Sequence, residues 1–484
     1  MKIAYEFGER SMFGLVAVAS LVVLGITGIS AQSPTGAVVT KPVETGKNSK
    51  GITRASQKVI DQHIDQAWMK KAMFDLLDHW RDASVMPNGF IQENLDRKWQ
   101  PWGTQREASL NGQGRQLYTM VEGYEYSHDK KYLDAMTRGA DFLLKMHDDQ
   151  YGGYFNRTKP DLTVIDDTKT GFQTFVIFPL ANAFRVTKDP RYEKAAMDQW
   201  HVMRDKMRDG QFFTNTMKRD FSGPAASPLG GRESRAGAAP APAGSAPAGP
   251  AGGRGGAPGP GAFAPGGHRL NVHMFEALLA LYEATKSKEV WDEITAELAQ
   301  MEKLYDYNLG YLPESYDDNW KATGGTNFNV GHLFEWASLF SRAVELGADP
   351  KFIALGNRSL DLGLKISYNK PDGGVWMNAS VTGEIARKYM IWWTECETLK
   401  VTARYAILHG RSDLWPYFDQ TLAFVKKNFL DTEYGGWFEG VIPGSPREAL
   451  GDRAYLKGAV DGPELGSYHQ TTMFTDLLHL ASNK

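Results

Sequence analysis

The sequence predicts an all-α protein, an (α/α)6 barrel of six helical hairpins. Between successive copies of a recurring motif, the chain reads as two amphipathic helical stretches joined by a polar turn, as in 113–127 and 131–147. The motif recurs about every 60 residues once one low-complexity insert is discounted, and such a period indicates one repeated supersecondary unit. Each copy is a glycine followed within two residues by an aromatic side chain, at Gly89, Gly153, Gly210, Gly310, Gly374 and Gly436.

The two ends of the repeat region supply the sixth hairpin. One helix, 57–81, is expected before the first motif, and a single helix, 468–483, after the last. If these two helices pair, the ring closes with inner and outer helices alternating. The first helix of every pair then runs in the same direction, so that the N-terminal ends of these helices meet at one mouth. We therefore expect one functional site built from six helix starts.

Length and composition agree with a single large barrel domain at 56–484. The chain has 484 residues, 42% of them hydrophobic, and can bury a sizeable core. Its formal net charge of −3 points to neither nucleic acid nor a polyanion as a partner. Cys396 is the only cysteine, which excludes an intramolecular disulfide. A monomer and a homodimer both remain open.

The N-terminal segment 1–31 reads as a signal peptide. Its apolar stretch 13–29 follows Lys2 and Arg10 and ends before the small residues Ser30 and Ala31, which suit a cleavage site. A periplasmic or secreted protein is therefore expected, with 32–55 as a linker. Because a stretch of about 17 residues is at the lower bound for a membrane span, an uncleaved anchor is the alternative, and only then would the protein contact a membrane.

Residues 223–267 form a low-complexity insert in repeat three. They are almost entirely glycine, proline, alanine and serine. This composition cannot bury enough apolar surface to offset chain entropy, so the insert is predicted to be disordered. The repeat tolerates it because the entropy of loop closure grows slowly with loop length.

Two predicted inner helices each present a histidine backed by a carboxylate. His332 and Glu335 are spaced i, i+3, and so are His273 and Glu276, which places each pair on one helical face. Such a carboxylate can orient the imidazole and raise its basicity for acid–base chemistry. A metal site is the alternative, since histidine and carboxylate at this spacing also occur in di-metal helical bundles.

Two further polar residues stand at the same repeat phase. His469 opens the last predicted helix, and Arg115 lies at the start of another. A helix N-terminus disfavours imidazolium, so all three histidines are expected to be neutral bases near pH 7, around a spot that tolerates negative charge. The alternative for any single histidine is a hydrogen-bonded structural role.

Six motifs in order resemble the N-acylglucosamine 2-epimerase superfamily. This group includes sugar 2-epimerases such as cellobiose 2-epimerase and aldose–ketose isomerases such as mannose isomerase. The resemblance runs from about 113 to 470, skipping the insert, and implies the same (α/α)6 barrel. The motifs are "GRQLYT", "NVHMFEALLALY", "NVGHLFEWASL", "WWTECETL", "YGGWF" and "SYHQ".

The resemblance implies a carbohydrate 2-epimerase or aldose–ketose isomerase that works through an enediolate. His332 and His469 match the acid/base pair, His273 matches a histidine that handles the sugar ring, and Arg115 matches the arginine that holds the enediolate. Glu335 matches a carboxylate that supports the histidines. A mono- or disaccharide is the expected substrate, with no metal and no cofactor. The expected substrate contacts are Trp392, Trp393, Glu397, Glu276 and Tyr118.

The sequence departs from the family pattern and leaves two other functions open. The final motif "YHQTTMF" lacks an arginine that often follows the histidine, and Glu395 stands where a neutral amide is common. A glycoside hydrolase or polysaccharide lyase on the same barrel would need two carboxylates, such as Asp166 or Asp167 with Glu395, and would release a new reducing end. A non-catalytic sugar-binding module would show no turnover.

Overall fold

The computed structural model describes residues 52–103, 106–213, 216–225, 268–323, 327–385, 388–451, 455–458 and 466–482. The described residues belong to one compact unit, Glu44–Lys484. The predicted signal peptide at 1–31, residues 32–51 of the predicted linker and residues 226–267 of the predicted insert lie outside these ranges.

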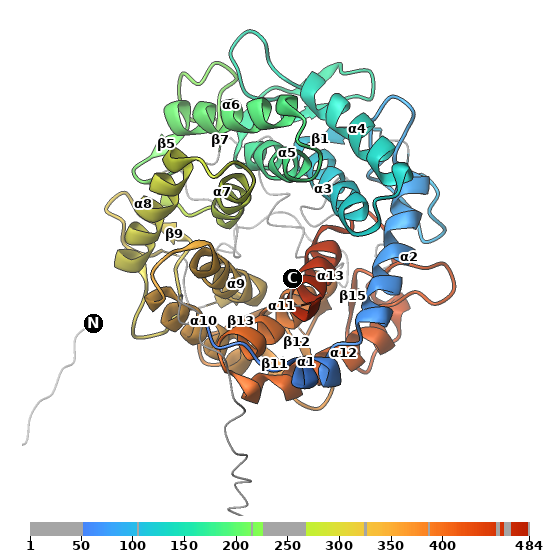
Figure 1. Cartoon of the computed structure of the whole chain (residues 1–484), viewed down its shortest axis with the longest axis vertical. Coiled ribbons are helices and arrows are strands. Elements are labelled where there is room, and N and C mark those ends of the chain that lie inside the picture. Colours follow the sequence, from blue (N-terminus) through green and yellow to red (C-terminus); the bar gives the residue numbers. More distant parts are fainter. Residues whose placement is uncertain are drawn as a thin grey trace, which may run out of the picture. The chain divides into compact units, whose positions relative to one another are not determined.

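The helices of this unit form two concentric rings (Figure 1). The inner ring consists of α3 (Leu110–Ser127), α5 (Thr174–Thr187), α7 (Val272–Thr285), α9 (Val330–Leu346), α11 (Trp392–Leu408) and α13 (Tyr468–Ser482). The outer ring consists of α2 (Gln66–Ser84), α4 (Lys130–Lys145), α6 (Pro190–Lys206), α8 (Lys288–Leu304), α10 (Lys351–Ser367) and α12 (Trp415–Asn428). Each inner helix packs on the next, and α13 packs back on α3. The predicted (α/α)6 barrel is therefore confirmed.

The first and last helices close the ring as expected, because α2 packs on α13. The single helix predicted at 57–81 is, however, two helices, α1 (Gln57–His63) and α2. The backbone is extended at Ile64, and α2 restarts behind Asp65, whose carboxylate accepts a hydrogen bond from the Trp68 amide at 3.0 Å. This N-cap satisfies a free amide at the start of α2 and explains the break.

The barrel includes the edges of the predicted linker and insert. The amide of Thr53 donates to Leu408 O at 3.0 Å and that of Ala55 to Ile407 O at 2.7 Å, so the end of the linker is bound to α11. Ala225 donates to the carbonyl of Thr216 at 3.1 Å. Residues 223–225 are therefore ordered, contrary to the predicted boundary of the insert.

Short antiparallel strand pairs hold the starts of the inner helices. Strands β1, β4, β8, β10 and β14 each come shortly before an inner helix, and each pairs with a strand from the next part of the chain, which fixes where that helix begins. Three short 3-10 helices, η1 (Gly171–Gln173), η2 (Ser412–Leu414) and η3 (Arg447–Leu450), complete the described elements. The sheets are β1 (Ala108–Ser109) with β2 (Arg157–Thr158) and β3 (Val164–Asp166), β4 (Lys169–Thr170) with β7 (Thr216–Met217), β5 (Arg208–Asp209) with β6 (Phe212–Phe213), β8 (His268–Arg269) with β9 (Ser315–Tyr316), β10 (Asn327–Asn329) with β13 (Asn378–Ser380), β11 (Tyr368–Asn369) with β12 (Gly374–Val375), and β14 (Met390–Ile391) with β15 (Gly440–Val441).

The recurring glycines occupy tight turns that follow the outer helices. Gly89 has a φ of 89°, and a Cβ there would lie 2.0 Å from the carbonyl oxygen of Arg138. Only glycine combines this left-handed backbone with such a close approach. In the fifth repeat, Gly373, with a φ of 88°, takes this conformation, and not the predicted Gly374. The repeat period thus reflects a backbone requirement that recurs once per hairpin.

A side chain in the first turn of several inner helices binds the backbone of the preceding hairpin. Gln113 accepts from the Ile91 amide at 2.9 Å and donates to the Ile91 carbonyl at 2.8 Å. Gln173 does the same with Tyr154, at 2.9 and 2.8 Å. Glu395 of α11 occupies the equivalent place and accepts from the Val375 amide at 2.9 Å. Burial raises the pKa of Glu395 well above its ordinary value, so it is a protonated stand-in for glutamine.

We expect Glu395→Gln to stabilise the fold, most strongly at alkaline pH. The buried carboxyl is protonated in the folded state and ionised in the unfolded state above about pH 4.3, so the wild type loses stability as pH rises, and the amide does not. The gain should reach roughly 1–3 kcal/mol near pH 8, measured by urea unfolding across pH. Glu384→Gln, an exposed position, is the control. A gain independent of pH would contradict this explanation.

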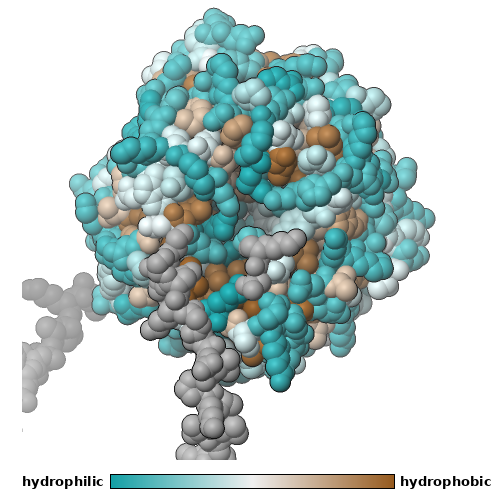
Figure 2. Space-filling model, in the orientation of Figure 1, coloured by the Kyte–Doolittle hydropathy of each residue, from teal (hydrophilic) through white to brown (hydrophobic). Residues whose placement is uncertain are grey.

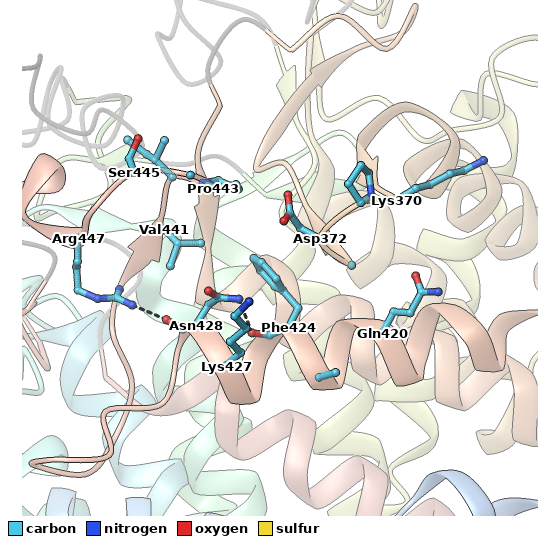
Figure 3. A pocket seen from close by; sticks show the side chains of 15 residues that line it. Lys370, Asp372, Gln420, Phe424, Lys427, Asn428, Val441, Pro443, Ser445 and Arg447 are labelled. Carbon is cyan, nitrogen blue, oxygen red and sulfur yellow. Dashed lines mark hydrogen bonds between the residues drawn. The ribbon is translucent and has the colours of Figure 1, made fainter.

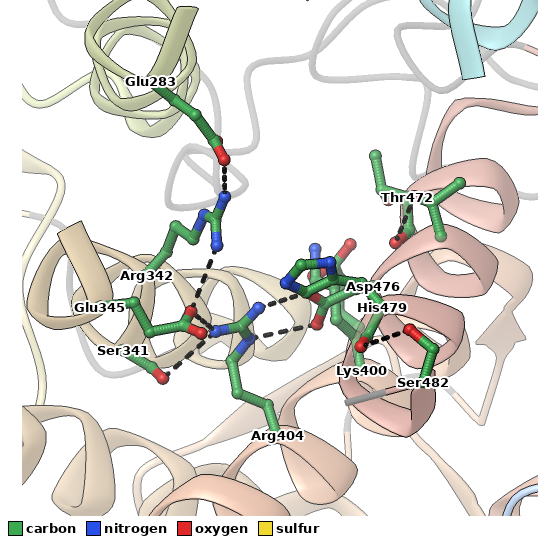
Figure 4. Close-up of polar contacts among 12 residues, drawn as sticks. Glu283, Ser341, Arg342, Glu345, Lys400, Arg404, Thr472, Asp476, His479 and Ser482 are labelled. Atoms are coloured by element: carbon green, nitrogen blue, oxygen red, sulfur yellow. Dashed lines mark hydrogen bonds and ion pairs between the residues drawn. The ribbon is translucent and has the colours of Figure 1, made fainter. Parts of the chain in front are cut away.

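A belt of ion pairs links inner helices near their C-terminal ends (Figure 4). Three arginines, one each from α5, α9 and α11, reach carboxylates on neighbouring helices. The belt lies at the opposite end of these helices from the predicted catalytic residues. Arg185 pairs with Glu122 and Glu125, Arg342 with Glu283 and Glu345, and Arg404 with Glu345 and Asp476.

The apolar core and the surface follow from the two rings. The buried apolar side chains of both helix layers form one hydrophobic cluster, which includes the fully buried Trp80, Trp200 and Trp336. The face shown in Figure 2 is mostly hydrophilic, with small scattered hydrophobic spots. Among the described residues, no helix combines the length and apolarity needed to span a membrane.

Candidate active site at the starts of the inner helices

The structure brings the predicted histidines and arginine together. His273, His332 and His469 lie in the first turns of α7, α9 and α13, and Arg115 lies in the second turn of α3. Arg115 Nη2 is 3.2 Å from His273 Nε2. The Glu335 carboxylate is 3.8 Å from His332 Nε2 and 3.9 Å from His469 Nδ1. His332 and His469 are thus linked through Glu335, and Arg115, which contacts His273, lies within electrostatic reach of His469. The strand pairs before α3, α7 and α9 fix where these helices begin.

His469 is buried and hydrogen-bonded through one ring nitrogen. Its Nδ1 is 3.0 Å from Glu397 Oε1, so Nδ1 carries the proton and the lone pair is on Nε2. Burial lowers the pKa of His469 to about 4, although Glu397 acts in the opposite direction. His469 is therefore neutral near pH 7 and suited to accept a proton, as the sequence predicts.

His332 is in the opposite state, contrary to the prediction of a neutral base. Its Nδ1 is 2.8 Å from Glu314 Oε2, and Glu314 also accepts from Trp336 Nε1 at 3.0 Å. Burial alone would lower the pKa of His332, but the Glu314 carboxylate raises it to about 9, with a further contribution from Glu335. A carboxylate in contact outweighs the helix dipole, so His332 is an imidazolium that can donate a proton.

Glu314 was not among the predicted site residues. The sequence pattern assigns the support of His332 to Glu335, its i+3 neighbour, yet Glu314 is the closer partner. Glu314 lies in the "LPES" segment after the Gly310 turn. Its position shortly after a repeat glycine is the one signal that points to it.

Glu335 and Trp393 lie between the two acid–base histidines. Burial, together with the nearby Glu397 carboxylate, raises the pKa of Glu335 to about 8. The Trp393 ring centroid is 5.7 Å from that of His332 and 5.3 Å from that of His469. Trp393 thus has the better position of the two predicted tryptophans to contact a substrate held between the histidines.

Arg115, His273 and Glu276 form the second half of the cluster. The Arg115 guanidinium lies 4.7 Å from the ring centroids of both Phe175 and Tyr468. Glu276 Oε2 is 3.5 Å from His273 Nδ1, as the i, i+3 spacing predicts, and it also accepts a hydrogen bond from the Tyr468 hydroxyl. Burial lowers the pKa of His273, so its neutral ring presents Nε2 to Arg115.

The other two predicted substrate contacts lie at the margin of the cluster. Tyr118 packs in an aromatic group, with its ring centroid 4.7 Å from Phe178 and 5.9 Å from Tyr468. Trp392 starts α11, and its amide donates to the carbonyl of Glu439 at 3.1 Å. Both are buried. Their described contacts support the walls of the site.

Lys400 is a second site residue that was not predicted. It lies on α11, three residues after Glu397, and its Nζ is 2.5 Å from Glu397 Oε2. Burial alone would raise the pKa of Glu397, but the Lys400 ammonium and His469 hold it below its usual value. A lysine at i+3 from a glutamate is common on solvent-exposed faces of helices, so the sequence alone does not mark it.

Glu335, Glu397 and His469 could geometrically surround a metal ion, because one ligand atom from each lies within 4.8 Å of the others. Their charges are already balanced by protein groups, however. Lys400 contacts Glu397, His469 Nδ1 faces the same carboxylate, and Glu335 lies near the His332 imidazolium. The donor set fits an acid–base network better than a cation site, and we assign no metal ligands here.

Two of the three carboxylates considered for a hydrolase, Asp166 and Glu395, have structural roles, while Asp167 is exposed. Asp166 accepts from Asn156 Nδ2 at 2.6 Å and from the Thr168 hydroxyl at 2.8 Å. Glu395 is fully buried on the Val375 backbone. Glu395 thus binds the backbone of the hairpin and does not face a glycosidic bond. This excludes the carboxylate pair that a hydrolase would need.

A cavity of about 530 Å³ lies elsewhere on the protein, between α12 and the loops of the last two repeats (Figure 3). Its lining includes Lys370, Asp372 and Phe424. Arg447 donates to the backbone carbonyls of Gly440 and Asn428 there. None of the predicted site residues lines this cavity.

Comparisons with known proteins identify a matching family and similar folds. The model of the N-acylglucosamine 2-epimerase (GlcNAc 2-epimerase) family matches residues 89–229 and 260–446. A mannose-6-phosphate isomerase of Rhizobium meliloti (strain 1021) is 30% identical over 150 residues, which are 30% of this chain and 39% of that protein. The matched segment thus spans well under half of that relative.

Solved structures share the fold at low sequence identity. The cellobiose 2-epimerase from Spirochaeta thermophila DSM 6192 aligns with a TM-score of 0.71 at 20% identity, covering 88% of this chain and 98% of that one. A D-mannose isomerase aligns with a TM-score of 0.68 at 16% identity, covering 85% and 97%. An unsaturated glucuronyl hydrolase from Bacillus sp. GL1 is more distant, with a TM-score of 0.53 at 13% identity, covering 86% and 97%.

Proposed function

The chain belongs to the N-acylglucosamine 2-epimerase family, and from this premise we propose that it is a sugar 2-epimerase or aldose–ketose isomerase acting on a reducing-end sugar. One observation carries the proposal. Two histidines, the half-buried His332 and the buried His469, are in opposite protonation states, and each lies within 4 Å of the same carboxylate, Glu335. An acid and a base on a shared scaffold are what proton transfer between two faces of an enediolate requires.

The proposed reaction removes one proton from the sugar and returns one proton to it. Nε2 of His469 removes the proton from carbon 2 of the open-chain aldose, and the electron pair forms an enediolate. The Arg115 guanidinium stabilises the negative charge on its oxygen. Proton delivery from His332 to the opposite face of carbon 2 gives the 2-epimer, whereas delivery to carbon 1, with transfer of the O2 hydroxyl proton to O1, gives the ketose.

Deuterium incorporation tests the function directly. The purified protein is incubated with a panel of reducing mono- and disaccharides in D₂O, and products are followed by NMR. Deuterium at carbon 2 of the epimer, or at carbon 1 of the ketose, is the expected result. A new reducing end would instead indicate a hydrolase. Absence of label and of product with every sugar would overturn the proposal.

The pH dependence of kcat/KM should be a plateau that begins at about pH 4 and ends between about pH 8, where Glu335 loses its proton, and about pH 9, where His332 loses its own. Below the plateau His469 is protonated and cannot accept the proton, and above it His332 has lost the proton it must donate. Initial rates are measured across pH, and samples returned to pH 7 control for irreversible inactivation. A profile with one limb near pH 6.5, the ordinary pKa of histidine, would show that the two environments do not act as described.

We also propose that the protein works in the periplasm or outside the cell. The support is the apolar stretch 13–29, followed by Ser30 and Ala31. N-terminal sequencing of the protein from its native host would test this, with a mature start at Gln32 expected. Recovery of the full-length chain from the cytoplasm would contradict it.

A further inference from the structure

Lys400 is a buried cation in direct contact with the support of the proposed base. Its side chain is 13% exposed and that of Glu397 is 1% exposed. The two oxygens of Glu397 serve different partners, since Oε1 faces His469 Nδ1 at 3.0 Å and Oε2 faces Lys400 Nζ at 2.5 Å. The ammonium, the carboxylate and the imidazole are thus arranged in series.

The charged groups around this series come from three further inner helices, α3, α7 and α9. Glu276 of α7 and Glu335 of α9 act on Lys400 in addition to Glu397, and all three carboxylates favour its charged form. Arg115 of α3 and Lys400 both act on His469 of α13 and favour its neutral form. The buried Cys396 thiol also lies within electrostatic reach of Lys400. Lys400 is therefore the cation shared by three carboxylates at the centre of the cluster.

We propose that Lys400 is a positioning residue, whose ammonium group fixes the Glu397 carboxylate on Nδ1 of His469 and leaves Nε2 as the proton acceptor. This inference rests on the proposed function, because it assigns Lys400 to the base of that reaction. A carboxylate held between an ammonium and an imidazole stays ionised and keeps one orientation. It therefore selects the Nδ1–H tautomer of His469 and the direction of its ring.

Removal of the ammonium changes the proton affinity of the whole pair. Without Lys400, the surroundings of the buried Glu397–His469 pair lose one positive charge. The pair therefore binds a proton at higher pH. A proton on His469 abolishes the base, and a proton on Glu397 abolishes the contact that orients it. In either case the acid limb of the pH profile moves upward, since the two groups titrate as a pair.

The experiment compares pH profiles of kcat/KM for wild type, Lys400→Met and Lys400→Arg. In Lys400→Met the acid limb should move up from about pH 4 by roughly 1–3 units, the usual effect of a neighbouring charge. Lys400→Arg, which keeps the charge, should leave the limb near its wild-type place. Lys169→Met removes another buried lysine, which pairs with Asp148 at 3.0 Å rather than with Glu397, and should not move the limb.

The outcomes separate this inference from the proposed function. If the acid limbs of wild type and Lys400→Met coincide, the proposed role of Lys400 is wrong. Turnover of a sugar by wild type would still support the proposed function in that case. If no sugar is turned over, NMR titration of ¹³C-labelled His469 in both proteins still measures the shift. Lys400→Gln replaces the methionine variant if that does not fold. If both neutral variants fail to fold and Lys400→Arg folds with a displaced limb, the lysine is only a structural counter-ion.

Discussion

Replacing His469 by glutamine should lower kcat by roughly 10²–10⁴, the usual contribution of a well-placed acid or base, and should slow deuterium incorporation at carbon 2 by a similar factor. The amide keeps a hydrogen-bond donor near Glu397 but has no lone pair basic enough to accept a carbon-bound proton. Because the removed interaction acts on the reacting proton, KM should change far less than kcat. Steady-state kinetics and NMR exchange on the same preparation measure both effects.

His201→Gln is the matched control for this change. His201 lies on the outer helix α6, where it pairs with Glu289 at 3.2 Å, and not on an inner helix. It should retain wild-type kcat and exchange. If His469→Gln also kept full exchange, another group would be the base, and the proton-transfer scheme built on His469 would be wrong.

Replacing Arg404 by methionine should reduce the free energy of unfolding by about 3–5 kcal/mol, the cost of removing one partner from a buried ion pair. Arg404 is 2% exposed and pairs with Glu345 of α9 and Asp476 of α13. Without the guanidinium, two partly buried carboxylates, each 17% exposed, would remain near one another with less compensation. Urea unfolding followed by circular dichroism measures the change.

Arg191→Met is the matched control for the belt. Arg191 also contacts two carboxylates, Asp189 and Asp141, but its side chain is 55% exposed. Its loss should cost at most about 1 kcal/mol, as is usual for surface ion pairs. Equal effects of the two substitutions would show that burial of the belt does not determine its contribution.

Much of the fold was accessible from the sequence because its signals are local. The glycines of the hairpin turns recur once per repeat, and the amphipathic pattern between them is that of two helices. The break at Ile64 and Asp65 was missed because the apolar periodicity continues across a two-residue interruption. The sequence pattern assigned the turn position to Gly374 although Gly373 has the left-handed backbone, because either of two adjacent glycines satisfies the pattern.

The sequence by itself determined the six-hairpin ring and the phase at which three histidines and an arginine occur, since spacing along a helix is a local property. It also paired His273 with Glu276, whose contact lies within one turn. Only the tertiary structure decided that Glu314 holds His332 and that Glu397 holds His469, because these partners are 18 and 72 residues apart and meet only where a loop folds back on its helix and where two inner helices pack together. Those contacts set the opposite charges of the two histidines, since the pKa of a buried group depends on which charges the fold places beside it.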